Sequence, residues 1–427
     1  MKIKNPILKI ALPAVVTNIT VPLLGLVDLA VVGHMGAPEY IGAIAIGTTI
    51  FNMLYWVFAF LRMGTTGIIS QAYGGNDTET IYYGLLRSLI LGGVLSVLLL
   101  ILQEPLLRFS LWMMAPAPMV AEQASLYVHV CIWGAPAMLA SYGLTGWFIG
   151  MQDTRIPMFT AILQNILNIF ATVIMVFVLG WGVAGVAIGT VVGLYGGLLF
   201  AMCRVERICP IKRQIDWSVL LRRDELLRFF SVNRDIFLRT LCMVAVTVYF
   251  TTAGSRLGGL YLDANALLVQ FFIIYSYFTD GLANAAEALS GKFVGRGDRQ
   301  GLRVIVRQLF CWGGGLALFF TLCYVFGGSW ILSILTNQQA VVRTALAYMV
   351  WVYAVPFVAL AAFVWDGVYI GMTATRQMFL SMFVAAIVFF VLWFLLGNYY
   401  GNHALWLAFL AYLATRGLMQ TLLFRHY

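Results

Sequence analysis

One acidic residue, Asp28, lies inside a long apolar segment near the start of the chain. The surrounding sequence from Asn18 to Gly33 has no basic residue within a helical turn of it. A carboxylate in hydrocarbon is costly, so such a residue usually faces a bundle interior or a water-filled cavity and has a function. A buried carboxyl group is suited to taking up and releasing a proton near working pH. We therefore predict that Asp28 is a protonation site; the alternative is a carboxylate bonded to another helix and kept for packing.

A second polar set lies in the apolar segment 156–179. Its members recur at helical spacing and are expected to share one face: Gln164, Asn165, Asn168 and Thr172. Amide groups in lipid need partners, so this face should point to the helix that carries Asp28 or to a wet cavity. Asn18, about two to three turns before Asp28, is expected to join it. The alternative is that these amides only join helices, and it stays open for Asn165.

Two prolines, Pro13 and Pro22, occur in the same segment as Asp28. Each removes one backbone donor and can bend a helix. A hinge at these positions is one hypothesis; the alternative is that they reflect only the high frequency of proline in membrane helices.

The second half of the chain has a denser ionisable set. Asp280, Asn284 and Glu287 follow the i, i+4, i+7 pattern of one helix face. Asp366 lies alone in another apolar segment. This half is predicted to hold a second cation or proton site, an ion-pair gate, or a structural network of arginine and carboxylate. We favour the structural reading for Glu287 and leave it open for Asp280 and Asp366.

Arg239 and Arg62 both lie in apolar segments. Asp235 and Arg239 are four residues apart, which predicts an ion pair on one helix. Arg62 lies two residues beyond Phe60, the position that matches Asp280 in the other half, so we expect it to face the bundle centre. Charges within lipid are expected to pair.

Composition predicts an all-α integral membrane protein. Of 427 residues, 62% are hydrophobic and 10% are charged, and many apolar runs reach the length of a transmembrane helix. Twelve spans are expected at 8–33, 42–70, 84–104, 122–149, 156–179, 182–204, 226–254, 264–290, 303–326, 341–370, 377–397 and 402–424. The net charge of +9 is not a nucleic-acid signal, because the basic residues concentrate in alternate loops. The opposite loops hold only Arg108, Arg256 and Arg343, so both termini are predicted to be cytoplasmic.

The two halves of the chain, on either side of a polar linker, have similar sequences. We predict an N-terminal six-helix lobe at 1–204, a cytoplasmic linker at 205–225 and a C-terminal six-helix lobe at 226–427. Four matches keep their order at an offset of about 220 residues: Ile149–Arg155 with Ile370–Arg376, Ser70–Asp77 with Ser290–Asp298, Arg87 with Arg307, and Pro136 with Pro356. Lobes with an even number of spans are parallel repeats, related by a pseudo-twofold axis along the membrane normal. Such repeats are typical of transporters.

Signals of a soluble enzyme are missing. The sequence has no phosphate-binding glycine loop and no zinc-type histidine spacing, so we expect no enzyme activity, no cofactor and no metal. The six cysteines lie mostly inside spans and show no ligand spacing. Without a nucleotide site, uphill transport would need an ion gradient.

Several segments resemble one protein family. The chain looks like the DinF branch of the multidrug and toxic compound extrusion (MATE) family through Asn18–Asp28, Phe60–Gly67, Asn165–Ile169, Asn233–Ile236, Asp280–Ala283, Glu287–Gly291 and Leu396–Ala408. The resemblance implies a V-shaped pair of six-helix bundles and cation-coupled antiport of organic compounds. It also implies that Asp28 is the protonation site and that Asn165 and Asn168 line the cavity of the first lobe.

The chain departs from the family at one position. Where the pattern has a second acid, four residues after Asn168, this sequence has Thr172. Thr172 cannot hold a transferable charge, so Asp28 is expected to act alone. In other branches an acid in the tenth helix helps to bind sodium, and Asp366 looks like its counterpart.

These observations predict an exporter of organic, often cationic or amphipathic, drugs or metabolites in the inner membrane. The coupling ion is expected to be H⁺, with Na⁺ as the alternative. The expected partners are small organic substrates and membrane lipid but no nucleic acid, and we expect a monomer. One alternative function is a flippase for lipid-linked precursors, which a related two-lobed family performs; a sensor or assembly factor without a transport cycle is another.

Overall fold

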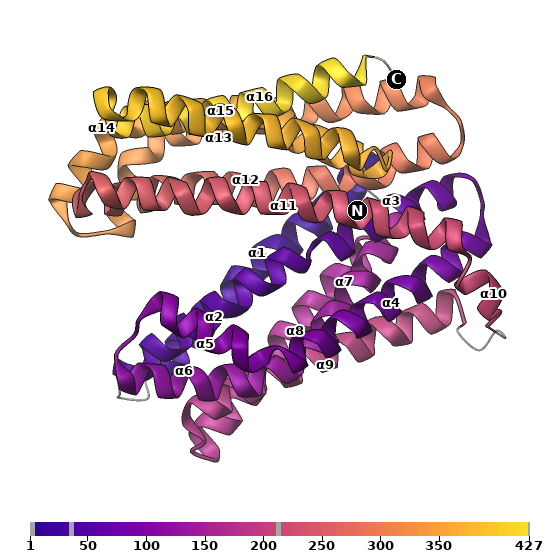
Figure 1. Cartoon of the computed structure of the whole chain (residues 1–427), viewed down its shortest axis with the longest axis horizontal. Helices are drawn as coiled ribbons and strands as arrows, with labels where there is room; N and C mark the ends of the chain where they lie inside the picture. The colour runs from indigo at the N-terminus through magenta and orange to yellow at the C-terminus, as the bar shows by residue number, and fades with distance from the viewer. Residues whose placement is uncertain (1–4, 34–37, 211–214, 426–427) are drawn as a thin grey trace. The chain divides into compact units, whose positions relative to one another are not determined.

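The computed structural model describes residues 5–33, 38–210 and 215–425, with the side chains of 21–24, 26–29 and 38 outside that description. Every regular element in these ranges is a helix (Figure 1). Helices satisfy their own backbone groups, which is the condition for crossing lipid.

The first half of the chain combines long helices with several short ones. They are α1 (Pro6–Gly33), α2 (Pro38–Phe58), α3 (Phe60–Gly74), α4 (Thr78–Ile101), α5 (Gln103–Met114), α6 (Pro118–Cys131), η1 (Ile132–Gly134), α7 (Ala135–Gly150), α8 (Arg155–Val173), η2 (Ile174–Val178), α9 (Gly182–Ile208) and α10 (Trp217–Leu220). Helices α2 and α3 continue one another across Ala59, and η2 is a π-helical turn at the end of α8.

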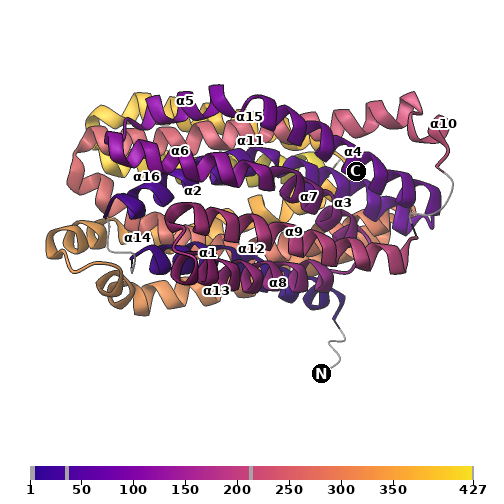
Figure 2. The same ribbon diagram turned by 90° about the horizontal axis from the view of Figure 1, so that it is seen from below.

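Six helices of 23 to 37 residues form the rest of the described chain. They are α11 (Arg223–Leu257), α12 (Gly259–Gly295), α13 (Arg299–Leu335), α14 (Gln339–Gly371), α15 (Thr375–Tyr400) and α16 (Asn402–Phe424). Helices α12, α13 and α14 pack against one another, and their axes lie lengthwise in Figure 2. The core between them is aromatic, with Phe271, Tyr275 and Trp406 fully buried.

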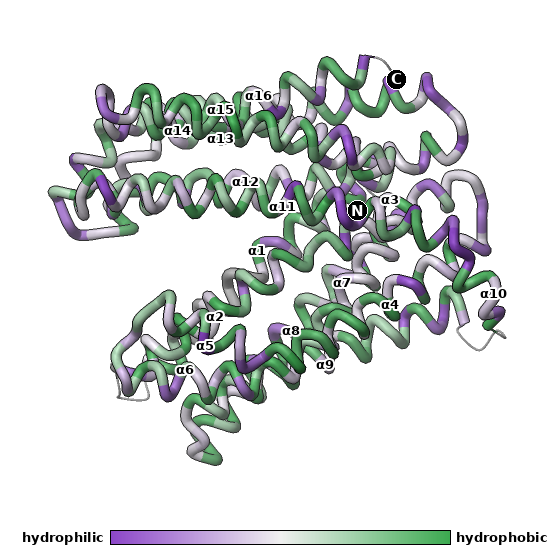
Figure 3. Tube along the Cα trace, viewed as in Figure 1, coloured by the Kyte–Doolittle hydropathy of each residue, from purple (hydrophilic) through white to green (hydrophobic). Residues whose placement is uncertain are grey.

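The described residues contain 11 helices that are long and apolar enough to cross a membrane. The expected first span, 8–33, corresponds to α1 (Pro6–Gly33), and among its described residues Pro6–Thr20 is an apolar helix. Figure 3 shows apolar colour along the helices and hydrophilic colour gathered at many of their ends and turns. The prediction of an all-α membrane protein is therefore confirmed.

The chain divides into two compact units, Leu12–Phe229 and Phe230–Tyr427, and Met1–Ala11 belongs with the second. We call them the N unit and the C unit. Two details differ from the predicted division at 204 and 226. The expected linker belongs to the N unit, and the boundaries fall inside α1 and α11.

The two units repeat the same local geometry. Gln152 and Thr373, at matching positions of the repeat, both have positive φ angles, 67° and 52°. Asp77 begins α4 by accepting the Thr80 N–H at 2.9 Å, and Asp298 begins α13 by accepting the Gly301 N–H at 2.7 Å. These shared turns and caps support the duplication that the sequence predicted.

The described part of the linker is fixed to α4. The guanidinium of Arg87 is buried and donates to the carbonyl oxygens of Val219, at 2.8 Å, and Leu220, at 3.1 Å. Arg87 also pairs with Glu225 at 3.4 Å. Helix α10 is thus held by a charged side chain that comes from a membrane span.

Candidate functional site

The polar stripe of α8 meets a stripe of glycines on α9. A Cβ at Gly189 would lie 2.1 Å from the Thr172 hydroxyl oxygen, and one at Gly193 would lie 2.9 Å from the Asn168 Cβ. Gly197 faces Gln164 in the same way. Small residues allow membrane helices to approach closely. Gln164, Asn168 and Thr172 therefore pack against α9.

Asn165 takes a different direction from that stripe. Its side-chain amide donates to the backbone oxygen of Thr20 on α1 at 2.8 Å. The four polar residues of α8 were expected to share one face, but they contact two different helices. Asn165 contacts α1, which carries Asp28, whereas the other three pack against α9. The reason is that residues one apart on a helix are turned by about 100°.

Two buried oxygen atoms on α8 have no hydrogen-bond partner among the described residues. They are Asn168 Oδ1 and Thr172 Oγ1, on side chains that are 1% and 0% exposed. The amide nitrogen of Asn168 does have a partner, the Thr190 hydroxyl on α9, at 3.1 Å. The N unit therefore keeps acceptors in its interior.

The predicted residues of α1 are only partly described. Asp28 and Pro22 lie in α1, but their side chains are outside the described residues. Asn18 is half-buried, and α1 continues as a helix through Pro13, whose carbonyl accepts the Thr17 hydroxyl at 3.0 Å. The protonation role of Asp28 and the hinge role of the prolines stay predictions.

In the C unit, Asp366 is the centre of a buried ion cluster. The carboxylate accepts hydrogen bonds from Arg239 on α11 and Arg416 on α16. Gln420, one turn after Arg416, donates to the same carboxylate at 2.8 Å. Asp366 is 5% exposed, and both arginines are buried. The cluster holds two positive charges and one negative charge.

This cluster corrects one prediction. Asp235 and Arg239 do not pair with each other, although they are four residues apart. Arg239 donates to Asp366, whereas Asp235 accepts from Arg234 at 2.9 Å and from the Thr375 hydroxyl at 3.2 Å. A local spacing permits an ion pair, but a buried partner on another helix competes for the same guanidinium.

Two members of the cluster, Arg416 and Gln420, were not predicted from the sequence. Their signal was present, because Arg416 is a lone arginine inside the last apolar segment. An arginine in a span must find a partner, and Asp366 is an acid in a neighbouring span.

The other predicted residues of the C unit lie on α12. Asp280 is half-buried, whereas Asn284 and Glu287 are buried, at 9% and 2% exposure. Helix α14 approaches this stretch closely, since a Cβ at Gly371 would lie 2.3 Å from the Glu287 carbonyl oxygen. In the N unit, Arg62 is half-buried on α3.

Within the described ranges, no three His, Cys, Asp or Glu residues are grouped so that they could hold a metal ion. Buried ionisable groups inside long apolar helices, in a chain built from two similar halves, define a class of protein: a membrane transporter.

Comparisons with known proteins identify the family. The MatE family model matches residues 13–174 and 236–395, so the chain belongs to this family. It is 36% identical over 420 residues to DNA damage-inducible protein F of Escherichia coli K12, covering 98% of this chain and 91% of that protein. The family consists of transporters, not enzymes.

Solved structures show the same fold. The bent form of VcmN, a MATE transporter of Vibrio cholerae, matches with a TM-score of 0.87 at 16% identity over 99% of this chain and 96% of that one. An outward-facing multidrug resistance transporter of the MATE family matches with a TM-score of 0.83 at 18% identity, over 99% and 95% of the two chains. The chain is thus a multi-pass transporter of the MATE type.

Proposed function

We propose that this transporter is a cation-coupled antiporter that exports organic, often cationic or amphipathic, compounds across the inner membrane, with H⁺ as the coupling ion. The choice of the proton-binding site rests on the hydrogen-bond partners of Asp366. Two arginines and an amide occupy its carboxylate, so it is a poor ligand for an exchanging cation. Coupling is then assigned to Asp28 in the N unit.

The surroundings of α8 support this assignment. Asn165 reaches the backbone of α1 at Thr20, and the buried Asn168 and Thr172 oxygens are acceptors without a partner among the described residues. Acceptors of this kind can hold a water molecule or a protonated group. Thr172 can contribute a hydrogen bond but no charge, so one carboxylate carries the exchange.

In the proposed cycle, proton and substrate compete for Asp28. A proton that arrives from outside neutralises the carboxylate, which removes the charge that attracts a cationic substrate. The substrate then leaves, and exposure to the inside returns the proton to the cytoplasm. Because Asp28 binds either the proton or the substrate but not both, export of the substrate is coupled to the proton gradient.

The test is transport by purified protein in liposomes with an imposed pH gradient and no sodium. Wild type should move a fluorescent organic cation, Asp28→Asn should lose gradient-driven transport, and Asp28→Glu should regain part of it. The matched control is Asp366→Asn, assayed at equal folded amount. Transport by Asp28→Asn at the wild-type rate would overturn the proposal.

Sodium is tested in the same liposomes. Transport that needs a sodium gradient, survives Asp28→Asn and is lost in Asp366→Asn or Asp280→Asn would move coupling to the C unit. The flippase alternative gains no support from the family match, since the chain belongs to MatE.

A further inference from the structure

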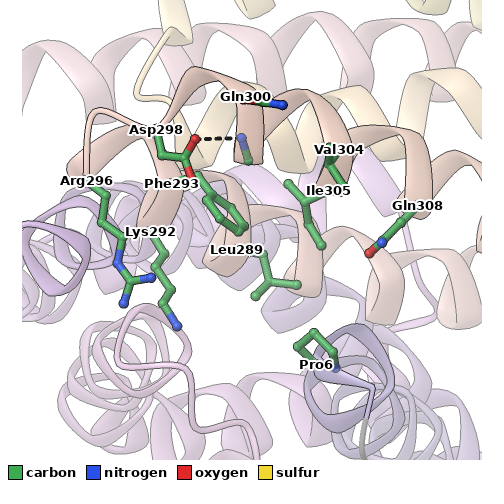
Figure 4. Close-up of a pocket in the computed structure, with 11 residues that line it drawn as sticks. Pro6, Leu289, Lys292, Phe293, Arg296, Asp298, Gln300, Val304, Ile305 and Gln308 are labelled. Atoms are coloured by element: carbon green, nitrogen blue, oxygen red, sulfur yellow. Dashed lines mark hydrogen bonds between the residues drawn. The ribbon is translucent and has the colours of Figure 1, made fainter.

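A pocket of about 430 Å³ lies in the C unit where α12 and α13 meet. The turn that joins the two helices is Arg296 to Asp298, and both helices are membrane spans. The pocket is therefore at the end of two spans, where hydrocarbon gives way to the polar interface. Pro6, at the start of α1, closes one side (Figure 4).

One end of the pocket is cationic. Lys292 and Arg296 both line it and are one turn apart on α12. Figure 4 shows the two side chains extending in the same direction from this helix. Lys9 on α1 is near enough to interact electrostatically with Lys292. Three basic residues thus surround this end.

The single acid in the lining does not cancel this charge. Asp298 Oδ1 accepts the Gly301 N–H at 2.7 Å, drawn as a dashed line in Figure 4. The carboxylate therefore caps the start of α13, where the helix dipole favours a negative charge. The cations of α12 remain the groups that attract an anion.

The lining becomes apolar away from the turn. Leu289 and Ile305 are each 4% exposed, and Val304 is 52% exposed. At a rise of about 1.5 Å per residue, these side chains lie one to two turns deeper in the spans than Arg296. An apolar wall of this depth suits an acyl chain.

We propose that this pocket binds an anionic phospholipid. The phosphate would lie between Lys292 and Arg296, and an acyl chain would follow Val304 and Ile305. The amide of Gln308, also in the lining, offers a donor to an ester carbonyl. Basic pockets at the ends of membrane helices bind lipid headgroups in this way. The inference is independent of the proposed antiport, because the pocket uses none of its residues.

The test measures lipid binding to the full-length purified protein by native mass spectrometry. Phosphatidylglycerol and phosphatidylcholine with the same acyl chains are titrated into wild type and into Lys292→Gln/Arg296→Gln. One cation near the surface contributes about fivefold in affinity, so the double variant should bind phosphatidylglycerol about 25-fold more weakly. Its affinity for phosphatidylcholine should stay unchanged.

The matched control is Arg155→Gln/Arg207→Gln, which removes two exposed arginines from the N unit. It should bind phosphatidylglycerol like wild type; an equal loss in both double variants would mean non-specific attraction and overturn the proposal. Val304→Asn should weaken both lipids, because it changes only the apolar wall.

Free anions are tested by competition. Glycerol phosphate and inorganic phosphate at millimolar concentration should not displace the lipid from wild type. Displacement by either would show a site for a soluble anion and would overturn the assignment of a lipid.

Discussion

At the scale of single residues, the Asp366 cluster has one more positive charge than negative charge. One carboxylate serves two guanidinium groups, and Arg239 Nε has no hydrogen-bond partner among the described residues. Removing the acid would leave two buried positive charges together, whereas removing Arg239 would leave a balanced pair. The two substitutions therefore have unequal consequences.

We predict that Asp366→Asn lowers the free energy of unfolding by about 3–5 kcal/mol, the usual cost of a buried charge that loses its partner. Arg239→Gln should cost less, about 1.5–3 kcal/mol, the range for a hydrogen bond to a charged group. Thermal unfolding of the purified variants in detergent measures both. A larger loss in Arg239→Gln than in Asp366→Asn would contradict this account.

The candidate site could be predicted in part at this scale. Residue type identified Asp366 and Arg239 as intramembrane charges. Their pairing could not be read from the sequence, because the partners are 127 residues apart and local spacing favoured Asp235. The sequence also could not show that Asn165 contacts α1 whereas Asn168, on the same helix, contacts α9.

At the scale of elements, the close packing of α8 against α9 depends on glycines in α9, which have no side chain. Gly193→Val should push the two helices apart, since a Cβ there already lies 2.7 Å from the Gln164 carbonyl oxygen. The expected loss is about 1–3 kcal/mol, typical of overpacking. Gly93→Val on α4, where a Cβ meets nothing within 4 Å, is the control. Equal unfolding temperatures for the two variants would refute the close contact.

The linker gives a second prediction about an element. Arg87→Gln removes the donor that holds the carbonyls of Val219 and Leu220, so α10 should detach. Hydrogen exchange should rise at least tenfold in residues 215–221, since bonds from a charged group contribute about 1.5–3 kcal/mol.

Arg307 provides the matched control for the linker. It is the repeat-equivalent of Arg87, but it is exposed on α13. Arg307→Gln should leave exchange in residues 215–221 unchanged. A similar rise in both variants would show that Arg87 does not hold α10.

The positions of most spans follow from hydropathy, but their ends do not. Helices α11 to α13 extend three or more residues beyond the expected spans at both ends, because a helix does not have to end where the apolar run ends. The short helices α5 and α10 and the π turn of α8 were not predicted. Each depends on tertiary contacts or on a local register that apolar periodicity does not encode.

At the scale of the whole molecule, the distribution of basic residues predicts the orientation. Green fluorescent protein fused after Arg425 should fluoresce, because this end is expected in the cytoplasm. Alkaline phosphatase fused after Asn337, in the turn between α13 and α14, should be active outside. The reverse pattern would overturn the positive-inside reading and exchange the two ends of the proposed proton path.

The fold as a whole was largely predictable, because lipid permits few structures and the duplication is visible in the sequence. The assignment of α1 was not. Its first residues belong with the C unit and the rest with the N unit, a division that no break in hydropathy marks.

This division of α1 has a consequence for biosynthesis. Pro6 is synthesised before Leu289, which follows it by roughly 280 residues, yet the two line one pocket. At about 5–20 residues per second, the ribosome needs roughly 15 to 55 seconds to supply that neighbour. During this interval the start of α1 lacks these contacts, so a late stage of folding must join it to a segment that is synthesised well after it.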